Sequence, residues 1–246
     1  MTMQMLMAVE MAGKTMPSVD MPPLKMIVDI EVLPNAPNGD LSFIFTFAEV
    51  SMEGSLVPSG TFDAIKGLTA AVAINDRGVV SNMKFATEKI TDPTIRQLLS
   101  ASGIEKLSAP LPIEPIGVGG KWEVTQPLEV GGMKSVQKSI YEIVSIDATG
   151  ATMTVSLEQS AAAQKVQSPA PGADVSLISM TGTGKGRVVL TAGQAVPYGN
   201  VDISSKAVMD ISAEGQTQRM ATDTKMKMTI AKGKRSTPDL PIDVGS

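Results

Sequence analysis

Methionines at alternate positions of the opening segment are the residues of this chain with the clearest chemical potential. They stand at Met1, Met3, Met5, Met7 and Met11. A thioether is a soft ligand, so a row of methionines could bind Cu(I) or Ag(I). The methionine side chain is also flexible and polarisable, so the row could form an apolar wall that adapts to a ligand. The third interpretation is ordinary protein core, and the pattern alone is compatible with all three.

Histidine and cysteine are absent from all 246 residues, and this absence limits the chemistry. It excludes Ser-His-Asp and Cys-His catalysis, zinc sites built from His or Cys, thiol redox chemistry and disulfides. A thioether site would have no His or Cys to complete it, so the sequence predicts no metal ion and no other cofactor. The 25 acidic residues are dispersed on polar strand faces, which is typical of a solvated surface. We therefore predict no catalytic residue and a protein that is not an enzyme.

Two short strings resemble nucleotide-binding or catalytic motifs, and neither is complete. Gly182-Thr-Gly184-Lys-Gly186 lacks the spacing of a phosphate-binding loop, and a strand-like Val-Val-Leu run follows it. Its alternating glycines instead predict a strand with one bare face, which allows a bend or the close approach of another segment. Ser135-x-x-Lys138 matches one motif of the penicillin-recognising enzymes, but their Ser-Asp-Asn and Lys-Thr-Gly motifs are absent. We expect both strings to be structural.

The charge pattern argues against a nucleic-acid partner. The net charge is −4 and aromatic residues make up 3% of the chain, whereas nucleic-acid binders present basic stripes with stacking aromatics. One basic patch, formed by Lys225, Lys227, Lys232, Lys234 and Arg235, could dock on anionic lipid headgroups or an acidic partner. Outward lysines also protect sheet edges from aggregation, and we favour this second interpretation.

In the segments that carry methionines at the two ends of the chain, apolar and polar residues alternate with a period of two. This alternation predicts half-buried strands. Residues 1–11 set methionines against Gln4 and Glu10, and residues 220–230 repeat the pattern with methionines opposite lysines. We therefore expect the first and last strands to lie close together in one sheet. The turn at 35–40 predicts a hairpin, whose second arm carries three of the five phenylalanines on one face.

The whole pattern predicts an all-β, mainly antiparallel fold: a curved sheet or half-open barrel of about ten strands with one or two short helical insertions. A helix is expected over 95–107, after the helix-start signal Thr91-Asp-Pro93, and a helical turn over 59–67. Residues 13–23 and 161–173 are expected to be loops. We predict a single domain over residues 1–246, with a Pro- and Gly-rich boundary near 108–120 dividing two β-rich halves.

The segment Leu111-Pro-Ile-Glu-Pro-Ile-Gly-Val-Gly-Gly-Lys-Trp122 resembles a group of uncharacterised bacterial exported β-rich proteins and lipoproteins. In that group a Pro-rich stretch leads to Val-Gly-x-x-Trp and a strand. The layout of strands and helices is also similar to the periplasmic lipoprotein carriers, whose curved half-barrels hold acyl chains around inserted helices. These resemblances imply a hydrophobic cavity, a periplasmic or cell-surface location, and an export signal that the given sequence lacks.

From the sequence we therefore predict a non-enzymatic extracytoplasmic carrier or binding protein for a lipid or another hydrophobic molecule. The alternative is a structural subunit of a cell-envelope or surface assembly, in which the same strands only pack. Partners are expected to be the hydrophobic ligand and a membrane surface or envelope protein. The predicted helix would gate the ligand site. The predicted ligand-binding residues are Met3, Met5, Met7, Phe43, Phe45, Phe47, Leu98, Leu99, Met226 and Met228.

Overall fold

The computed structural model describes residues 1–11, 13–52, 62–63, 65–86, 110–130, 132–166, 168, 173–213 and 215–233. These residues contain thirteen β-strands in a single sheet and no helix. The strands are β1 (Thr2–Met11), β2 (Lys14–Thr15), β3 (Val19–Val32), β4 (Leu41–Met52), β5 (Thr69–Ile74), β6 (Val80–Phe85), β7 (Lys121–Val130), β8 (Met133–Asp147), β9 (Gly150–Ala161), β10 (Gln164–Val166), β11 (Ala173–Thr191), β12 (Tyr198–Ala213) and β13 (Gln216–Ile230).

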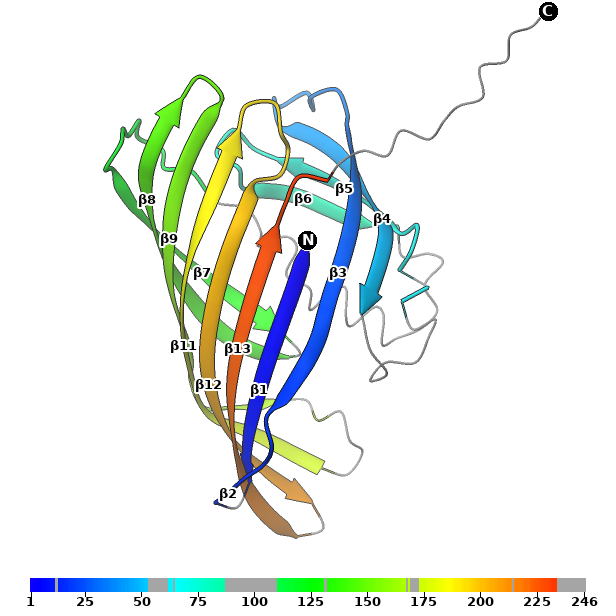
Figure 1. Cartoon of the computed structure of the whole chain (residues 1–246), viewed down its shortest axis with the longest axis vertical. Coiled ribbons are helices and arrows are strands. Elements are labelled where there is room, and N and C mark those ends of the chain that lie inside the picture. The colour runs from blue at the N-terminus through cyan, green and yellow to red at the C-terminus, as the bar shows by residue number, and fades with distance from the viewer. Residues whose placement is uncertain are drawn as a thin grey trace, which may run out of the picture.

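Every strand pair in the sheet is antiparallel, and the first and last strands meet in its middle (Figure 1). The order across the sheet is β6-β5-β4-β3-β1-β13-β12-β11-β9-β8-β7, with β2 beside β1 and β10 beside β11. The sheet is open, because β6 and β7 are its two edges and do not pair with each other. The all-β antiparallel class and the expected neighbourhood of the first and last strands are both confirmed.

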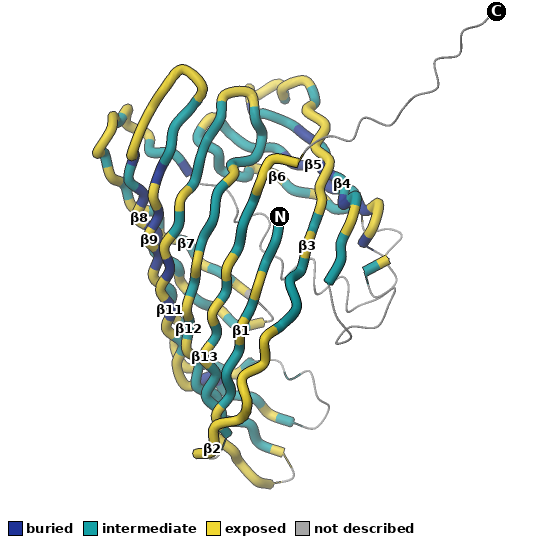
Figure 2. The backbone as a smooth tube through the Cα atoms, in the orientation of Figure 1, coloured by how far each residue is buried: buried dark blue, intermediate teal, exposed yellow. Residues whose placement is uncertain are grey.

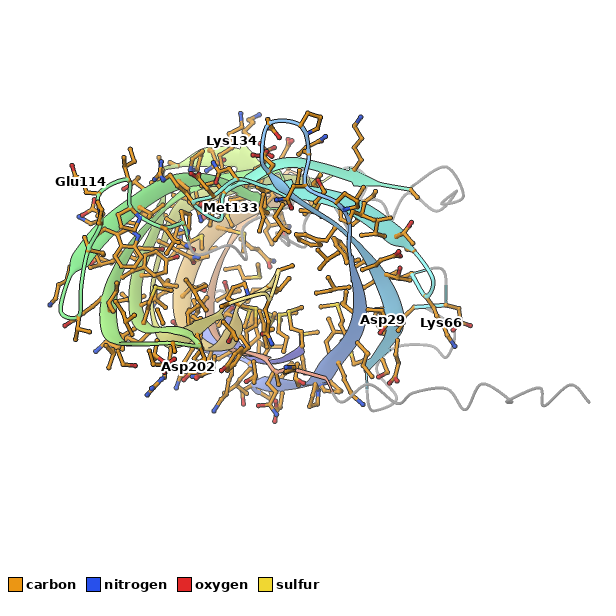
Figure 3. All side chains as sticks on the ribbon, turned by 90° about the horizontal axis from the view of Figure 1, so that it is seen from above. Asp29, Lys66, Glu114, Met133, Lys134 and Asp202 are labelled. Atoms are coloured by element: carbon orange, nitrogen blue, oxygen red, sulfur yellow. The ribbon has the colours of Figure 1, made fainter. Side chains whose placement is uncertain are left out.

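The two faces of the sheet differ in polarity, as the period-two alternation predicts. We call the face that carries Phe43, Phe45, Phe47 and Met153 the inner face, and the opposite face the outer face. In β1 the methionines at 3, 5 and 7 are half-buried on the inner face, whereas Gln4, Leu6 and Glu10 are exposed on the outer face. Figure 3 shows side chains projecting from both faces of the bent sheet, one set toward the space around which it bends.

Most of the buried apolar residues form two clusters on the inner face, one toward each edge of the sheet, and Leu177 of β11 is buried outside both (Figure 2). The first contains the three phenylalanines of β4 with Ile65, Leu68 and residues of β5, and Phe45 meets Phe47 edge-on at a centroid distance of 5.4 Å. The second contains Tyr141, Ile143, Met153 and Val155. The central strands β1, β13 and β12 lie between them, and their inner side chains are only half-buried.

The expected loop over 13–23 is wrong, because the short strand β2 and the start of β3 occupy most of it. Two prolines inside β3 explain the difference. Proline has no amide hydrogen to donate, and its presence argued against a strand. The structure accommodates Pro22 and Pro23 with a shift in register: Met3 pairs with Leu24 and Met5 pairs with Met21. This leaves both prolines opposite the single residue Gln4, which is the geometry of a β-bulge.

The alternating glycines at 182, 184 and 186 lie inside the single strand β11, so the expected strand with one bare face is confirmed. The glycines leave one face of β11 without side chains, and the neighbouring strands β12 and β9 pack closely against that face. A Cβ atom added at Gly184 would lie 2.8 Å from the Asp202 carbonyl oxygen and 3.0 Å from Leu157 Cδ1. One added at Gly186 would lie 2.3 Å from the Asn200 carbonyl oxygen. The expected close approach is therefore confirmed, and glycine is required for it.

The predicted helical elements have different outcomes. The described part of the 59–67 segment contains one turn, in which the amides of Ile65 and Lys66 donate to the Phe62 carbonyl. The helix expected over 95–107 lies outside the described residues. The count of about ten strands was too low, because β2 and β10 are too short to show a sequence period.

The close packing of β12 against the glycines of β11 predicts that a larger side chain at these positions destabilises the fold. We expect Gly186→Ala to lower the free energy of unfolding by about 1–3 kcal/mol, because the new methyl group overlaps the β12 backbone. Gly117→Ala is the control, since nothing lies within 4 Å of a Cβ at Gly117 and its φ is not positive. Urea denaturation measures both. Equal stability of the two variants would contradict the close packing of β11 on β12.

Candidate functional site

The central inner face consists of side-chain rows that run across the strands, because directly opposite residues share a face. In one row Met21 of β3 is opposite Met5 of β1, which is opposite Met226 of β13. In the adjacent row Met3 is opposite Met228. The pairing of β1 with β13 has no shift in register. It therefore brings together the methionines from the two ends of the chain.

The row through Met3 stays apolar across most of the sheet. From Met228 it continues to Val201 of β12, Gly186 of β11 and Val155 of β9. It ends at Tyr141 and Trp122, whose rings stack with a centroid distance of 5.2 Å. The Trp122 indole N–H donates to the Pro110 carbonyl at 2.7 Å. Burial raises the pKa of the Tyr141 phenol above its ordinary value, in agreement with an apolar environment.

The inner face becomes polar in the row through Met7. Met7 is opposite Thr224, and the row continues through Ser205 and Gly182 to Gln159. Gln159 is opposite Gln137 and donates to its side-chain oxygen at 2.8 Å, and Gln137 donates to the Ser139 hydroxyl at 3.1 Å. The inner face therefore combines two apolar rows with an adjacent band of hydroxyl and amide groups, an arrangement that suits an amphipathic molecule.

Exposed aliphatic side chains continue the apolar surface on β3. Val28, Ile30 and Val32 are opposite the three buried phenylalanines of β4, so they lie on the inner face. They are nevertheless 36%, 39% and 54% exposed, because they extend past the first residue of β1 and no described strand pairs with them on that side. Three large aliphatic side chains beside a buried aromatic cluster form an uncovered apolar surface.

The structure places the sequence-predicted site residues in two groups. Met3, Met5, Met7, Met226 and Met228 lie together on the central inner face and are half-buried. The phenylalanines at 43, 45 and 47 lie on the same face but belong to a packed core cluster, in which Phe47 is 1% exposed. Leu98 and Leu99 lie outside the described residues. The sequence-based site omitted Met21, which was assigned to a loop, and the β3 aliphatics, although their alternation with Asp29 and Glu31 marks them.

The outer face over the same strands is charged. Lys227 is opposite Asp202, and Lys225 is opposite Ser204 and Leu6. A hollow of about 520 Å³ lies there, and Asp20 also lines it. Because β13 is central in the sheet, Lys225 and Lys227 do not protect an edge, and the edge-protection interpretation is wrong for these two lysines. They stand among acids of neighbouring strands. Lys234 and Arg235 of the same basic patch lie outside the described residues.

The remaining motif-like strings are structural in the fold. Ser135 lies on the inner side of β8, whereas Lys138 lies on the outer side, where its ammonium pairs with Glu123 at 2.7 Å. The two side chains therefore cannot act on one substrate atom. Within the described ranges, no group of three or more His, Cys, Asp or Glu side chains gathers as a metal site. The same part of the chain has no helix long and apolar enough to cross a membrane.

No protein-family model, no curated protein and no solved structure matches the chain. The resemblance of residues 111–122 to exported bacterial proteins thus stays a sequence-based prediction. The candidate site is defined by the chain's own geometry: half-buried methionine rows, exposed aliphatics on β3, and a polar band beside them.

The assignment of residues to the two faces predicts different effects of the same substitution at the neighbouring residues Met5 and Gln4. We expect Met5→Asp to lower the free energy of unfolding by about 1–3 kcal/mol, because a carboxylate would enter an apolar row. Gln4→Asp is the matched control, since Gln4 is exposed on the outer face opposite Lys227 and should be nearly neutral. Urea denaturation monitored by Trp122 fluorescence compares them. Wild-type stability of Met5→Asp would show that the side chain does not face the interior.

Proposed function

We propose that the protein is a non-enzymatic binding or carrier protein for a lipid or another hydrophobic molecule. The observation that carries the proposal is the uncovered apolar surface on the inner face, where Val28, Ile30 and Val32 are exposed and the methionine rows are half-buried. A protein that used this face only for its own core would bury these side chains as fully as Phe47 or Met153, which are 1% and 0% exposed.

The energetics favour a ligand with a chain of methylene groups. Each buried methylene is worth about 0.8 kcal/mol, so a long acyl chain needs no specific polar contact for affinity. Methionine side chains adapt to irregular apolar partners, which suits a chain that adopts many conformations. The band of Thr224, Ser205, Gln159 and Gln137 adjoins these rows and offers donors and acceptors to a polar headgroup.

In this proposal the sheet acts as a half-open barrel with the ligand on its inner face. Two contacts support such curvature. Ala195 and Val196, in the connection between β11 and β12, pack against the phenylalanine cluster of β4 and β5. The Arg77 side chain, in the turn between β5 and β6, donates to the Leu111 carbonyl at 2.9 Å. Segments from distant parts of the sheet therefore meet. The extracytoplasmic location rests on the resemblance of residues 111–122 to exported proteins.

A structural subunit of an envelope or surface assembly is the second candidate, and one feature favours it. Val136 and Ile140 lie on the outer face of β8 and are 47% and 40% exposed. They adjoin the edge strand β7, so a neighbouring molecule could cover both the side chains and the open edge. In that role the apolar surface that matters is on the outer face.

A matched pair of substitutions separates the two functions, because Ile30 and Ile140 have nearly equal exposure, 39% and 40%, on opposite faces. We expect Ile30→Asp to weaken binding of the fluorescent fatty acid cis-parinaric acid by about tenfold, or 1.4 kcal/mol, and Ile140→Asp to leave it unchanged. Native mass spectrometry of the protein mixed with a lipid extract should show a bound lipid in the wild type and the Ile140 variant.

The opposite pattern would contradict the carrier function. Absence of probe and lipid binding by the wild type, together with oligomers that Ile140→Asp dissolves, would favour the structural subunit. Circular dichroism and urea denaturation of both variants check that each keeps its fold.

A further inference from the structure

We propose that five methionines on the central inner face form a binding site for a soft monovalent cation, Cu(I) or Ag(I), held by thioether sulfurs. This site does not depend on lipid binding, although it shares part of the same face. Its residues, which we call the methionine cluster, come from strands β3, β1 and β13: Met3, Met5, Met21, Met226 and Met228.

The register places one methionine at the centre of the cluster. Met5 has Met226 directly opposite on one side and Met21 directly opposite on the other. Directly opposite residues have Cβ atoms about 4.5–5.5 Å apart, and diagonal neighbours remain within reach of long side chains. Methionine has three rotatable bonds beyond its Cα, so the outer two sulfurs can lean toward the sulfur of Met5. Three thioethers can thus converge on one ion without movement of the backbone.

A second pair adds further sulfur ligands beside this triad. Met3 and Met228 are opposite each other, and each lies two residues along its strand from Met5 or Met226. That spacing corresponds to about 6.4–6.8 Å along a strand. A fourth thioether is therefore available to complete the coordination. The β-bulge at Pro22 and Pro23 is what brings Met21 into the row, because it shifts β3 relative to β1.

The surroundings of the cluster select a soft ion. Its neighbours in the same two rows, Leu24, Val201 and Ile203, offer no oxygen or nitrogen ligands from their side chains. The adjacent row contributes the hydroxyl of Thr224, opposite Met7. The nearby acids Asp20 and Asp202 lie on the outer face. Hard cations such as Ca²⁺ and Mg²⁺ prefer oxygen ligands, whereas thioethers select Cu(I). All five side chains are half-buried, so an ion can reach them from solvent and then be partly shielded from it.

The sequence favoured apolar wall or core over metal binding because no His or Cys is present. The structure favours metal binding more than the sequence does, since other strands supply the additional thioether ligands.

A second row of three methionines, Met11, Met220 and Met209, crosses β1, β13 and β12. It has no second methionine pair beside it, because Val9 and Thr222 occupy the next row. The test below therefore uses a Met209→Leu background, in which that row keeps only two thioethers.

Replacement of methionine by leucine is the decisive variant, because leucine keeps the volume and the apolar character but removes the sulfur. In the Met209→Leu background we expect Ag⁺, titrated against a competing chelator, to bind tightly at one ion per chain. The further double substitution Met5→Leu/Met226→Leu should weaken this binding by about tenfold or more, at least 1.4 kcal/mol. Cu(I), kept reduced without oxygen, should show the same loss.

Two methionines outside the cluster provide the matched control. Met16 is half-exposed beside β2, and Met133 begins β8, where its partner on β7 is Val130. Met16→Leu/Met133→Leu should leave Ag⁺ affinity unchanged. In protein labelled with ¹³C at the methionine methyl groups, Ag⁺ should shift cluster resonances and leave those of Met16 and Met133 in place.

Unchanged Ag⁺ affinity in Met5→Leu/Met226→Leu, or equal shifts of Met16 and Met133, would overturn the proposal. Ile30→Asp, which should weaken binding of cis-parinaric acid, lies outside the methionine cluster and removes none of its thioethers, so it should keep the Ag⁺ affinity of the wild type. Failure of the metal site and failure of the lipid function therefore give different results.

Discussion

The pairing of β1 with β13 is the interaction on which the rest of the architecture depends. It joins the first and last strands in the middle of the sheet, over ten residue pairs without a shift in register. Shifting β13 by a single residue would move its inner methionines to the outer face and its outer lysines to the inner face. The alternation of methionine with Lys225 and Lys227 makes that shift costly, so the two termini specify their own register.

The two buried clusters determine how much of the inner face is left uncovered. Toward one edge, the phenylalanines of β4 pack under the 62–68 turn and β5; toward the other, Met153 and Tyr141 pack under Trp122 and the segment that precedes β7. The close approach of β12 to the glycines of β11 joins the second cluster to the central strands. Between these clusters, strand pairing fixes the backbone of the methionine rows, and their side chains are only half-buried. This combination leaves an apolar surface that the described residues do not fully cover.

Much of this arrangement could be predicted from the sequence, because period-two alternation identifies strand faces directly. The inward direction of Met5 and Phe45 and the meeting of the two methionine strands follow from it. The glycines of β11 predicted a bare strand face that allows either a bend or a close approach, but the local pattern at Gly184 does not say which segment packs against it. The start of β3 could not be predicted, because Pro22 and Pro23 lowered the expectation of a strand and concealed Met21. The exposure of Ile30 depends on which strand lies beside it, and a local pattern carries no such information.

Charge and polarity separate the possible roles of the two faces. The outer face intersperses Lys227 with Asp202 and is typical of a solvated surface, apart from exposed aliphatic side chains such as Leu6, Ile27 and those of β8. The inner face has apolar rows and one polar band. A ligand with an apolar chain and a polar head matches the inner face, and a soft cation matches the sulfur atoms at its centre. Both proposals need the methionines of β1 and β13 to be neighbours.

That neighbourhood can be measured by disulfide formation, because the chain has no cysteine of its own. Opposite residues in antiparallel strands have Cα atoms about 4.5–5.5 Å apart, within the range that a disulfide spans. Under mild oxidation Met5→Cys/Met226→Cys should form an intramolecular disulfide, detected as the loss of both free thiols in monomeric protein. Met5→Cys/Lys227→Cys places the thiols on opposite faces and should stay reduced. A reversed result, with only the second pair oxidised, would contradict the register from which the site is built.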